Sequence, residues 1–268
     1  MSDKGFVNYL KEKELSENTI DVYLNALKQY EEFGGDYSKD SMVDFKWKML
    51  DQKSAKTVNI YLIALHQYCD YKKIPFDVKS IKIQTITAVD NVMSLEQYNR
   101  LIDGLEADGR YREALYIKII AKTGVRISEA LKLKQSDFNN ESIQMFTKGK
   151  VRTIYFSDQL RKEVKDFFGE LSDEPVYIGI RYAKRNKVLT TRGFDNILKR
   201  SCERYGIPRE VAHAHSLRHL FAIEFLKRNN NLSLLADILG HSGLNTTMIY
   251  TRLSQQEQLK AINNAVDW

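Results

Sequence analysis

Side chains that could act on a phosphate group occur in four short segments of the 268-residue sequence. In the first segment, residues 123–131, Arg126 follows a glycine that ends one predicted helix and precedes the start of another. Such a junction can aim a guanidinium at a phosphate without ordering a long loop. Taken alone, the segment is more commonly explained by a surface arginine, or by an ion pair in which Glu129 orients Arg126.

The second and third segments supply a lysine and a histidine–arginine pair. Lys148 lies in the short turn of a predicted hairpin, where it would be free to reach a ligand, although a solvated turn is the commoner explanation. His215 and Arg218 lie three positions apart, on one face of a predicted helix. His215 and His219 have the spacing of two zinc ligands, but neither an HExxH glutamate nor a nearby cysteine accompanies them. A zinc site is therefore not predicted.

The fourth segment, residues 239–250, contains His241 beside a glycine and ends on Tyr250. A phenol titrates near 10, so Tyr250 needs a positive site or a base before it can act as a nucleophile at neutral pH. By itself Tyr250 is one of 15 tyrosines, and a place in a hydrophobic core would explain it. Together the four segments offer what attack on a phosphodiester needs. They contain guanidiniums to clamp the oxygens, a nucleophile, and groups that donate or accept protons.

The distribution of charge favours a polyanionic partner. The net charge is +6, with 41 Lys and Arg against 35 Asp and Glu. Residues 1–84 hold 13 of each sign, so the whole excess lies in the rest of the chain. Within residues 181–228, 12 basic residues face four acidic ones. Such local excess is typical of nucleic-acid binding, although a solvated helical surface would also show it.

The elements that must position these side chains are mainly helical. Apolar residues at three- and four-residue steps predict helices near residues 6–10, 16–33, 40–50 and 54–71, which together form a small bundle. We place a linker at residues 85–92, between a first domain of residues 1–84 and a second of residues 93–268.

The second domain is predicted to be mixed but mostly helical. Ser94 and Gln97 form the pattern of a capping box at the start of a helix, and residues 111–122 are a strongly apolar helix. Residues 142–147 and 151–156 are predicted to form a small antiparallel hairpin, and residues 176–180 a third strand. The fold class is therefore mainly α.

In combination and in this order, the four segments resemble the tyrosine recombinase, or phage integrase, family. That family has a TGxRxSE segment, a hairpin lysine, an HxLRH helix and an LGHxxxxTTxxYT ending. The resemblance covers about residues 94–253, and residues 1–72 look like the family's helical, SAM-like core-site-binding domain. With no further domain evident before the bundle, the chain looks like the small Xer-like or transposon-type members.

The resemblance implies a catalytic role for each of six residues. Tyr250 would be the nucleophile, Arg126 and Arg218 the phosphate-binding pair, Lys148 the general acid, and His215 and His241 further parts of the phosphate site. Lys150 competes with Lys148 for the acid role, and His219 is interpreted as structural. The implied reaction is site-specific cleavage and rejoining of DNA through a 3′-phosphotyrosyl intermediate, without cofactor or metal.

The implied partner is double-stranded DNA, bound by a homotetramer on two sites that is a monomer when free in solution. Alternatives are a type IB topoisomerase-like enzyme, a non-catalytic DNA-binding protein and, more weakly, a metal-dependent nuclease. Leu259, Ile262 and Val266 form one apolar stripe near the C-terminus that could dock in cis or in trans. Two widely spaced cysteines, no apolar run of membrane-spanning length and no signal segment favour a cytoplasmic protein.

Overall fold

The computed structural model describes residues 3–83, 91–147, 150–176, 189–241 and 243–251, with residues 263, 265 and 266. The chain divides into two compact units, Met1–Ile86 and Thr87–Trp268. Most of the predicted linker, residues 85–90, and most of the C-terminal apolar stripe lie outside the described residues. Within the described ranges, no helix combines the length and apolar character needed to cross a membrane.

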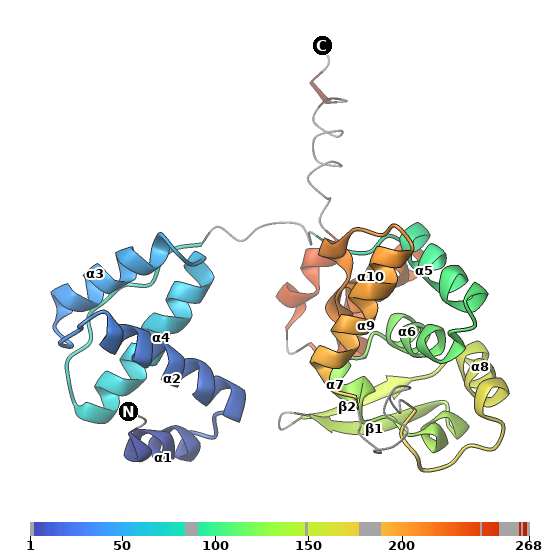
Figure 1. Ribbon diagram of the computed structural model, residues 1–268, viewed down its shortest axis with the longest axis horizontal. Coiled ribbons are helices and arrows are strands. Elements are labelled where there is room, and N and C mark those ends of the chain that lie inside the picture. Colours follow the sequence, from blue (N-terminus) through green and yellow to red (C-terminus); the bar gives the residue numbers. More distant parts are fainter. Residues whose placement is uncertain are drawn as a thin grey trace. The chain divides into compact units, whose positions relative to one another are not determined.

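The described part of the first unit contains four helices (Figure 1): α1 (Lys4–Glu12), α2 (Glu17–Glu32), α3 (Lys39–Leu50) and α4 (Ala55–Lys72). Serine side chains begin three of them, because Ser16, Ser38 and Ser54 each accept a hydrogen bond from a backbone N–H in the first turn. These caps satisfy donors that have no partner inside the helix. The predicted four-helix bundle is confirmed.

Aromatic side chains fill much of the core of this first unit. Phe6, Tyr30 and Phe45 are all fully buried. The rings of Tyr30 and Phe45 meet edge to face with centroids 5.1 Å apart, a favourable aromatic geometry. The Tyr30 hydroxyl remains satisfied because it donates to Ser41 Oγ at 3.0 Å.

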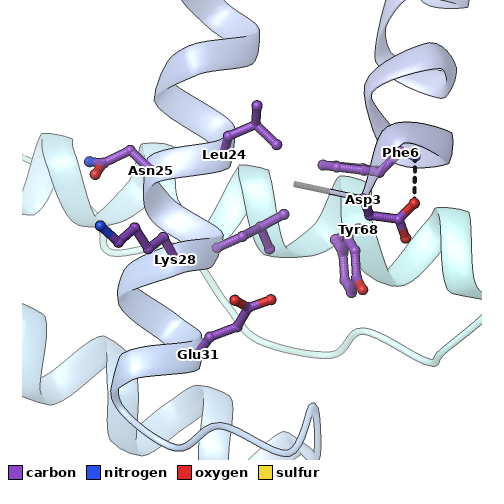
Figure 2. Close-up of a pocket in the computed structure, with 8 residues that line it drawn as sticks. Asp3, Phe6, Leu24, Asn25, Lys28, Glu31 and Tyr68 are labelled. Atoms are coloured by element: carbon purple, nitrogen blue, oxygen red, sulfur yellow. Dashed lines mark hydrogen bonds between the residues drawn. The ribbon is translucent and has the colours of Figure 1, made fainter. Parts of the chain in front are cut away.

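A hollow of about 310 Å³ opens on the first unit between α1, α2 and α4. Figure 2 shows Lys28 and Glu31 along α2, opposite Phe6 of α1 and Tyr68 of α4. The Asp3 carboxylate lies at the edge of the hollow and accepts a hydrogen bond from the Phe6 N–H at 3.2 Å. The side chains with candidate phosphate chemistry all belong to the second unit.

The second unit is mostly helical and carries one small sheet among its described residues. Its elements are α5 (Leu95–Ala107), α6 (Tyr111–Thr123), α7 (Ile127–Ala130), η1 (Gln135–Asn139), β1 (Ser142–Thr147), β2 (Lys150–Tyr155), α8 (Asp158–Phe168), α9 (Thr191–Arg204), η3 (Arg209–Val211), α10 (Ala214–Asn229), α11 (Leu232–Leu239), η4 (Leu244–Thr246) and η5 (Met248–Tyr250). The mainly helical fold class is confirmed. The capping box of Ser94 and Gln97 is also present.

Helix α6 runs through the core of the second unit and packs against α5, α8 and α10. It is apolar on nearly every side, with Leu115, Ile117, Ile119 and Ile120 buried. A helix buried on all faces is fixed in place by its neighbours. Both of its ends therefore offer fixed points from which a site can be built.

The hairpin of β1 and β2 is antiparallel, with Met145 opposite Arg152 and Phe146 opposite Val151. Because side chains alternate across a strand, Arg152 points inward and is 7% exposed, whereas Phe146 and Val151 are exposed. The predicted hairpin is confirmed. Most of the predicted third strand, residues 177–180, lies outside the described residues.

Candidate active site

Arg218 is the buried centre of the candidate site. It lies on α10, is 1% exposed, and donates to the carbonyl oxygens of Gly124 at 2.6 Å and Leu239 at 2.7 Å. Its Nη2 also lies 3.1 Å from His241 Nε2. The guanidinium thereby joins the C-terminal ends of α6 and α11, and its fork of donors suits this task better than a lysine ammonium would.

Glycines make these two carbonyls available. Gly124 and Gly240 end α6 and α11, each with a φ of +62°, in the left-handed region that favours glycine. Space is also tight, because a Cβ at Gly124 would meet Phe221 at 2.5 Å and one at Gly240 would meet Arg152 at 2.8 Å. The glycines in both sequence segments therefore serve the geometry around Arg218.

Arg126 is held by a carboxylate that it shares with Arg152. Its backbone N–H donates to Glu129 Oε2 at 2.8 Å, and its Nη1 lies 3.1 Å from Glu129 Oε1. Glu129 Oε2 also accepts from Arg152 Nη1 at 2.9 Å. The Arg126 side chain remains 38% exposed, whereas those of Glu129 and Arg152 are 1% and 6% exposed. Arg126 is therefore oriented yet open to a ligand.

Arg152 is a site residue that the sequence interpretation missed. Its Nε and Nη2 atoms are buried and have no hydrogen-bond partner among the described residues. The available signal was its place in the strand, because Arg152 shares the inward face with Ile154 while the apolar Val151 points outward. A charged side chain on the core face of a strand is almost always paired with a partner inside the protein.

The three guanidiniums make this region strongly positive. Burial, followed by the charges of Arg126 and Arg152, lowers the pKa of Arg218 to about 9, so it still carries its charge at neutral pH. Burial is also the main reason that the pKa of Arg152 is lowered. With one carboxylate, Glu129, among them, these groups leave a net positive site suited to an anion.

His241 is a neutral acceptor beside Arg218. Burial, and then the charges of Arg218 and Arg126, lower its pKa to about 4. Arg218 Nη2 can only donate, so His241 Nε2 must be the acceptor of that hydrogen bond. The Nδ1–H of His241 then donates to Thr247 Oγ1 at 2.8 Å. Thr247 is fully buried, so it fixes the orientation of the ring.

His215 is exposed and lies one helical turn before His219. The two rings meet edge to face with centroids 4.3 Å apart. The pKa of His215 is lowered, first because packing removes water from part of the ring and second because Arg218 is positive. Among the described residues, no three His, Cys, Asp or Glu side chains gather as metal ligands.

Tyr250 lies in η5 and packs against the small apolar cluster of Ala222, Leu235 and Leu239. Its hydroxyl oxygen is 2.7 Å from His219 Nδ1. Burial raises the pKa of Tyr250 to about 12, against the opposing effect of Arg218 and Arg126. The phenol is therefore protonated and near the positive groups in this state.

The structure places five of the six predicted site residues in one region of the second unit, namely Arg126, His215, Arg218, His241 and Tyr250. The sixth, Lys148, lies outside the described residues, between β1 and β2. Residues that the sequence interpretation did not place in the site, or treated as structural, are Arg152, Thr247 and His219.

Comparisons with known proteins agree in both units. Residues 91–257 match the family described as phage integrase family, and residues 4–73 match phage integrase, N-terminal SAM-like domain. The chain is 27% identical over 267 residues to tyrosine recombinase XerA of Pyrococcus furiosus, covering 97% of this chain and 92% of that protein. It is 26% identical to tyrosine recombinase XerD of Oceanobacillus iheyensis, covering 94% and 93%.

Solved structures of similar fold include complexes with DNA. The integrase of transposon Tn1549 in complex with circular intermediate DNA superposes with a TM-score of 0.74 at 17% identity, covering 98% of both chains. The recombinase XerH bound to its difH substrate gives a TM-score of 0.68 at 24% identity, covering 85% of this chain and 70% of that one. At these identities the likeness establishes the fold.

Proposed function

The chain belongs to the phage integrase family of tyrosine recombinases, and from this membership we propose that it breaks and rejoins double-stranded DNA at a specific site through a covalent bond to Tyr250. One observation carries the proposal beyond membership. The Tyr250 hydroxyl of η5 contacts His219, the residue that follows Arg218 on α10, and the charges of Arg218 and Arg126 oppose the effect of burial on its pKa. Positive charge beside a phenol favours the ionised, nucleophilic form and also binds a phosphate.

In the proposed reaction, Arg126 and Arg218 hold the non-bridging oxygens of the scissile phosphate by charge-assisted hydrogen bonds. The Tyr250 oxygen forms a bond to phosphorus as the bond from phosphorus to the 5′ oxygen breaks. The phenol loses its proton to solvent, and the 5′ oxygen gains a proton. The resulting 3′-phosphotyrosine keeps a phosphodiester, so attack by a 5′ hydroxyl reverses the step and rejoins the strand.

Lys148 is the proposed donor of the proton to the 5′ oxygen. It follows the last residue of β1 in the sequence. A lysine in a cationic site has its pKa lowered toward the range in which it can give up a proton. Lys150 remains the alternative donor. A substrate with sulfur in place of the 5′ oxygen tests this role, because a thiolate leaves without protonation.

We assign residues 1–84 to recognition of the DNA core site, residues 85–92 to the linker, and residues 93–268 to catalysis. The proposed assembly is a homotetramer on two DNA sites, built from monomers that meet on DNA in the cytoplasm. What supports a DNA partner is that similar proteins, such as XerH and the Tn1549 integrase, are described in complexes with DNA. The relatives named above are recombinases or an integrase, so they give no support to the topoisomerase alternative.

The test is covalent trapping on a nicked suicide substrate, in which the cleaved strand diffuses away and rejoining is blocked. The parent protein should form an adduct that survives a denaturing gel, and sequencing the trapped DNA would identify the target site. Tyr250→Phe should form no adduct while binding DNA with nearly unchanged affinity. An adduct that persists in Tyr250→Phe would contradict the assignment of the nucleophile.

A further inference from the structure

His219 lies directly against the nucleophile, although it is not one of the six residues discussed above. It follows Arg218 on α10 and is 9% exposed. Its Nδ1 is 2.7 Å from the Tyr250 hydroxyl oxygen, and the two ring centroids are 5.4 Å apart. In the described part of the chain, this is the hydrogen bond that the Tyr250 side chain makes.

The direction of this hydrogen bond follows from the protonation of the two groups. Burial raises the pKa of Tyr250 to about 12, so the phenol carries its proton. Burial, and then the charge on neighbouring His215, lower the pKa of His219 to about 3, so its ring is neutral. Tyr250 therefore donates to His219 Nδ1, and the ring proton of His219 is on Nε2. With these pKa values full transfer of the phenolic proton to His219 is strongly unfavourable, so His219 is an acceptor rather than a base. The proton leaves to solvent as the bond from the Tyr250 oxygen to phosphorus forms, because that bond makes the hydroxyl strongly acidic.

The acceptor is held in place before any substrate arrives. The ring of His219 meets the ring of His215 edge to face at 4.3 Å, and the neighbouring Arg218 fixes this face of α10 through two backbone carbonyls. The Tyr250 ring, in turn, packs against the apolar cluster that α10 and α11 form with Ala222, Leu235 and Leu239. The phenol is thus held at its ring by apolar contacts and at its oxygen by His219.

We propose that His219 is a positioning residue for Tyr250: by accepting the hydroxyl proton in a hydrogen bond, it turns a lone pair of the phenolic oxygen toward the phosphate that Arg126 and Arg218 bind. This inference rests on the proposed function. The physical reason is orientation, since a hydroxyl whose proton is held by a fixed acceptor presents its lone pairs in other directions. The apolar contacts of the ring do not fix the direction of the O–H bond, and His219 supplies that restraint.

The test compares His219→Phe, which keeps a ring and removes the acceptor, with His219→Asn, whose side-chain oxygen falls near the position of Nδ1. We measure single-turnover adduct formation on the nicked substrate. His219→Phe should react about tenfold to a hundredfold more slowly than the parent, because a misplacement of about 1 Å can cost about a hundredfold in rate. His219→Asn should recover most of that loss. His66→Phe, in the first unit, is the matched control and should react like the parent.

Two further measurements separate positioning from a merely structural role. DNA affinity and the urea midpoint of unfolding should change little in His219→Asn. With a 5′-bridging sulfur substrate, the defect of His219→Phe should persist because the nucleophile is still misplaced, whereas that of Lys148→Ala should largely disappear.

The results that would overturn the proposal are distinct from failure of the proposed function. If the parent forms no adduct, the proposed function fails first. If the parent forms one and His219→Phe reacts as fast or faster, His219 does not assist the nucleophile. A folded His219→Asn as slow as His219→Phe would likewise overturn it. If His219→Phe does not fold, His219→Gln takes its place, because the side-chain oxygen of glutamine falls nearer the position of Nε2 than of Nδ1. Equal cleavage rates for His219→Gln and His219→Asn would then refute the proposal.

Discussion

Replacing Arg126 or Arg218 by lysine separates catalysis from stability. Lysine keeps the charge but loses the planar fork of donors. Arg126 is 38% exposed and Arg218 is 1% exposed, so the two substitutions remove similar phosphate contacts from very different surroundings. Both should slow cleavage strongly, but Arg218→Lys alone should also destabilise the fold.

The magnitudes follow from the contacts. Loss of one preorganised donor to a developing charge costs about 2.7–4 kcal/mol, or about 100- to 1000-fold in rate. For Arg126→Lys the free energy of unfolding should change by less than about 1 kcal/mol, because the pair with Glu129 is partly exposed and Arg152 still holds that carboxylate. In Arg218→Lys, one ammonium cannot reach both backbone carbonyls, and a buried carbonyl left unpaired costs about 1–3 kcal/mol.

The assays are single-turnover cleavage at saturating protein and urea unfolding of each variant. Tyr250→Phe is the matched control, since it should abolish cleavage with little change in affinity for DNA. A cleavage rate within about threefold of the parent for Arg126→Lys would refute the assignment of this guanidinium to the transition state. Unchanged stability of Arg218→Lys would refute the structural role of its two carbonyl bonds.

Three other expectations can be measured. Cleavage in excess EDTA should match that in Mg²⁺ within about threefold, since the proposed chemistry uses no metal; complete loss would indicate a nuclease. Truncation after Ser254 should leave single-site binding intact on native gels but abolish two-site synapsis, if the apolar C-terminal stripe docks in a second copy. The pKa values of His219 and His241 are lowered from 6.5 to about 3 and about 4, so both residues bind fewer protons in the folded than in the unfolded state. Their stabilising effect is therefore complete well above pH 6.5 and is lost as the pH falls to about 4 for His241 and about 3 for His219. Between about pH 7.5 and about pH 5, the urea midpoint of unfolding should therefore fall further for the parent than for His219→Phe.

Much of the fold could be predicted because local chemistry agrees with it. Ser16 and Ser54 begin helices as their caps require, and Ser94 with Gln97 forms its capping box. Two strands on either side of a short turn predict the hairpin, and the structure differs only in that β2 begins one residue earlier, at Lys150. These signals act over a few residues, which is the range that a single sequence reveals.

The contacts of the site depend on longer-range packing that local pattern does not carry. Tyr250 meets His219 across 31 residues, and Arg218 meets Gly124 across 94. The sequence interpretation treated His219 as structural, since nothing local shows that η5 returns to α10. Arg152 was missed because a charged residue in a short strand is usually expected to face water. The inward face that it shares with Ile154 was the signal that could have found it.

Burial, reinforced by the positive charge of the site, explains why His241 and His219 act as acceptors. Arg126 and Arg152 share the carboxylate of Glu129, and the charges of both lower the pKa of Arg218, so further positive charge there would be repelled. Burial and these charges keep His241 neutral at ordinary pH. A neutral imidazole can accept a hydrogen bond, which an imidazolium cannot. His241 Nε2 accepts a hydrogen bond from Arg218, and His219 Nδ1 accepts one from the Tyr250 hydroxyl. The arrangement that would attract a phosphate therefore also makes the imidazoles able to orient the groups that act on it.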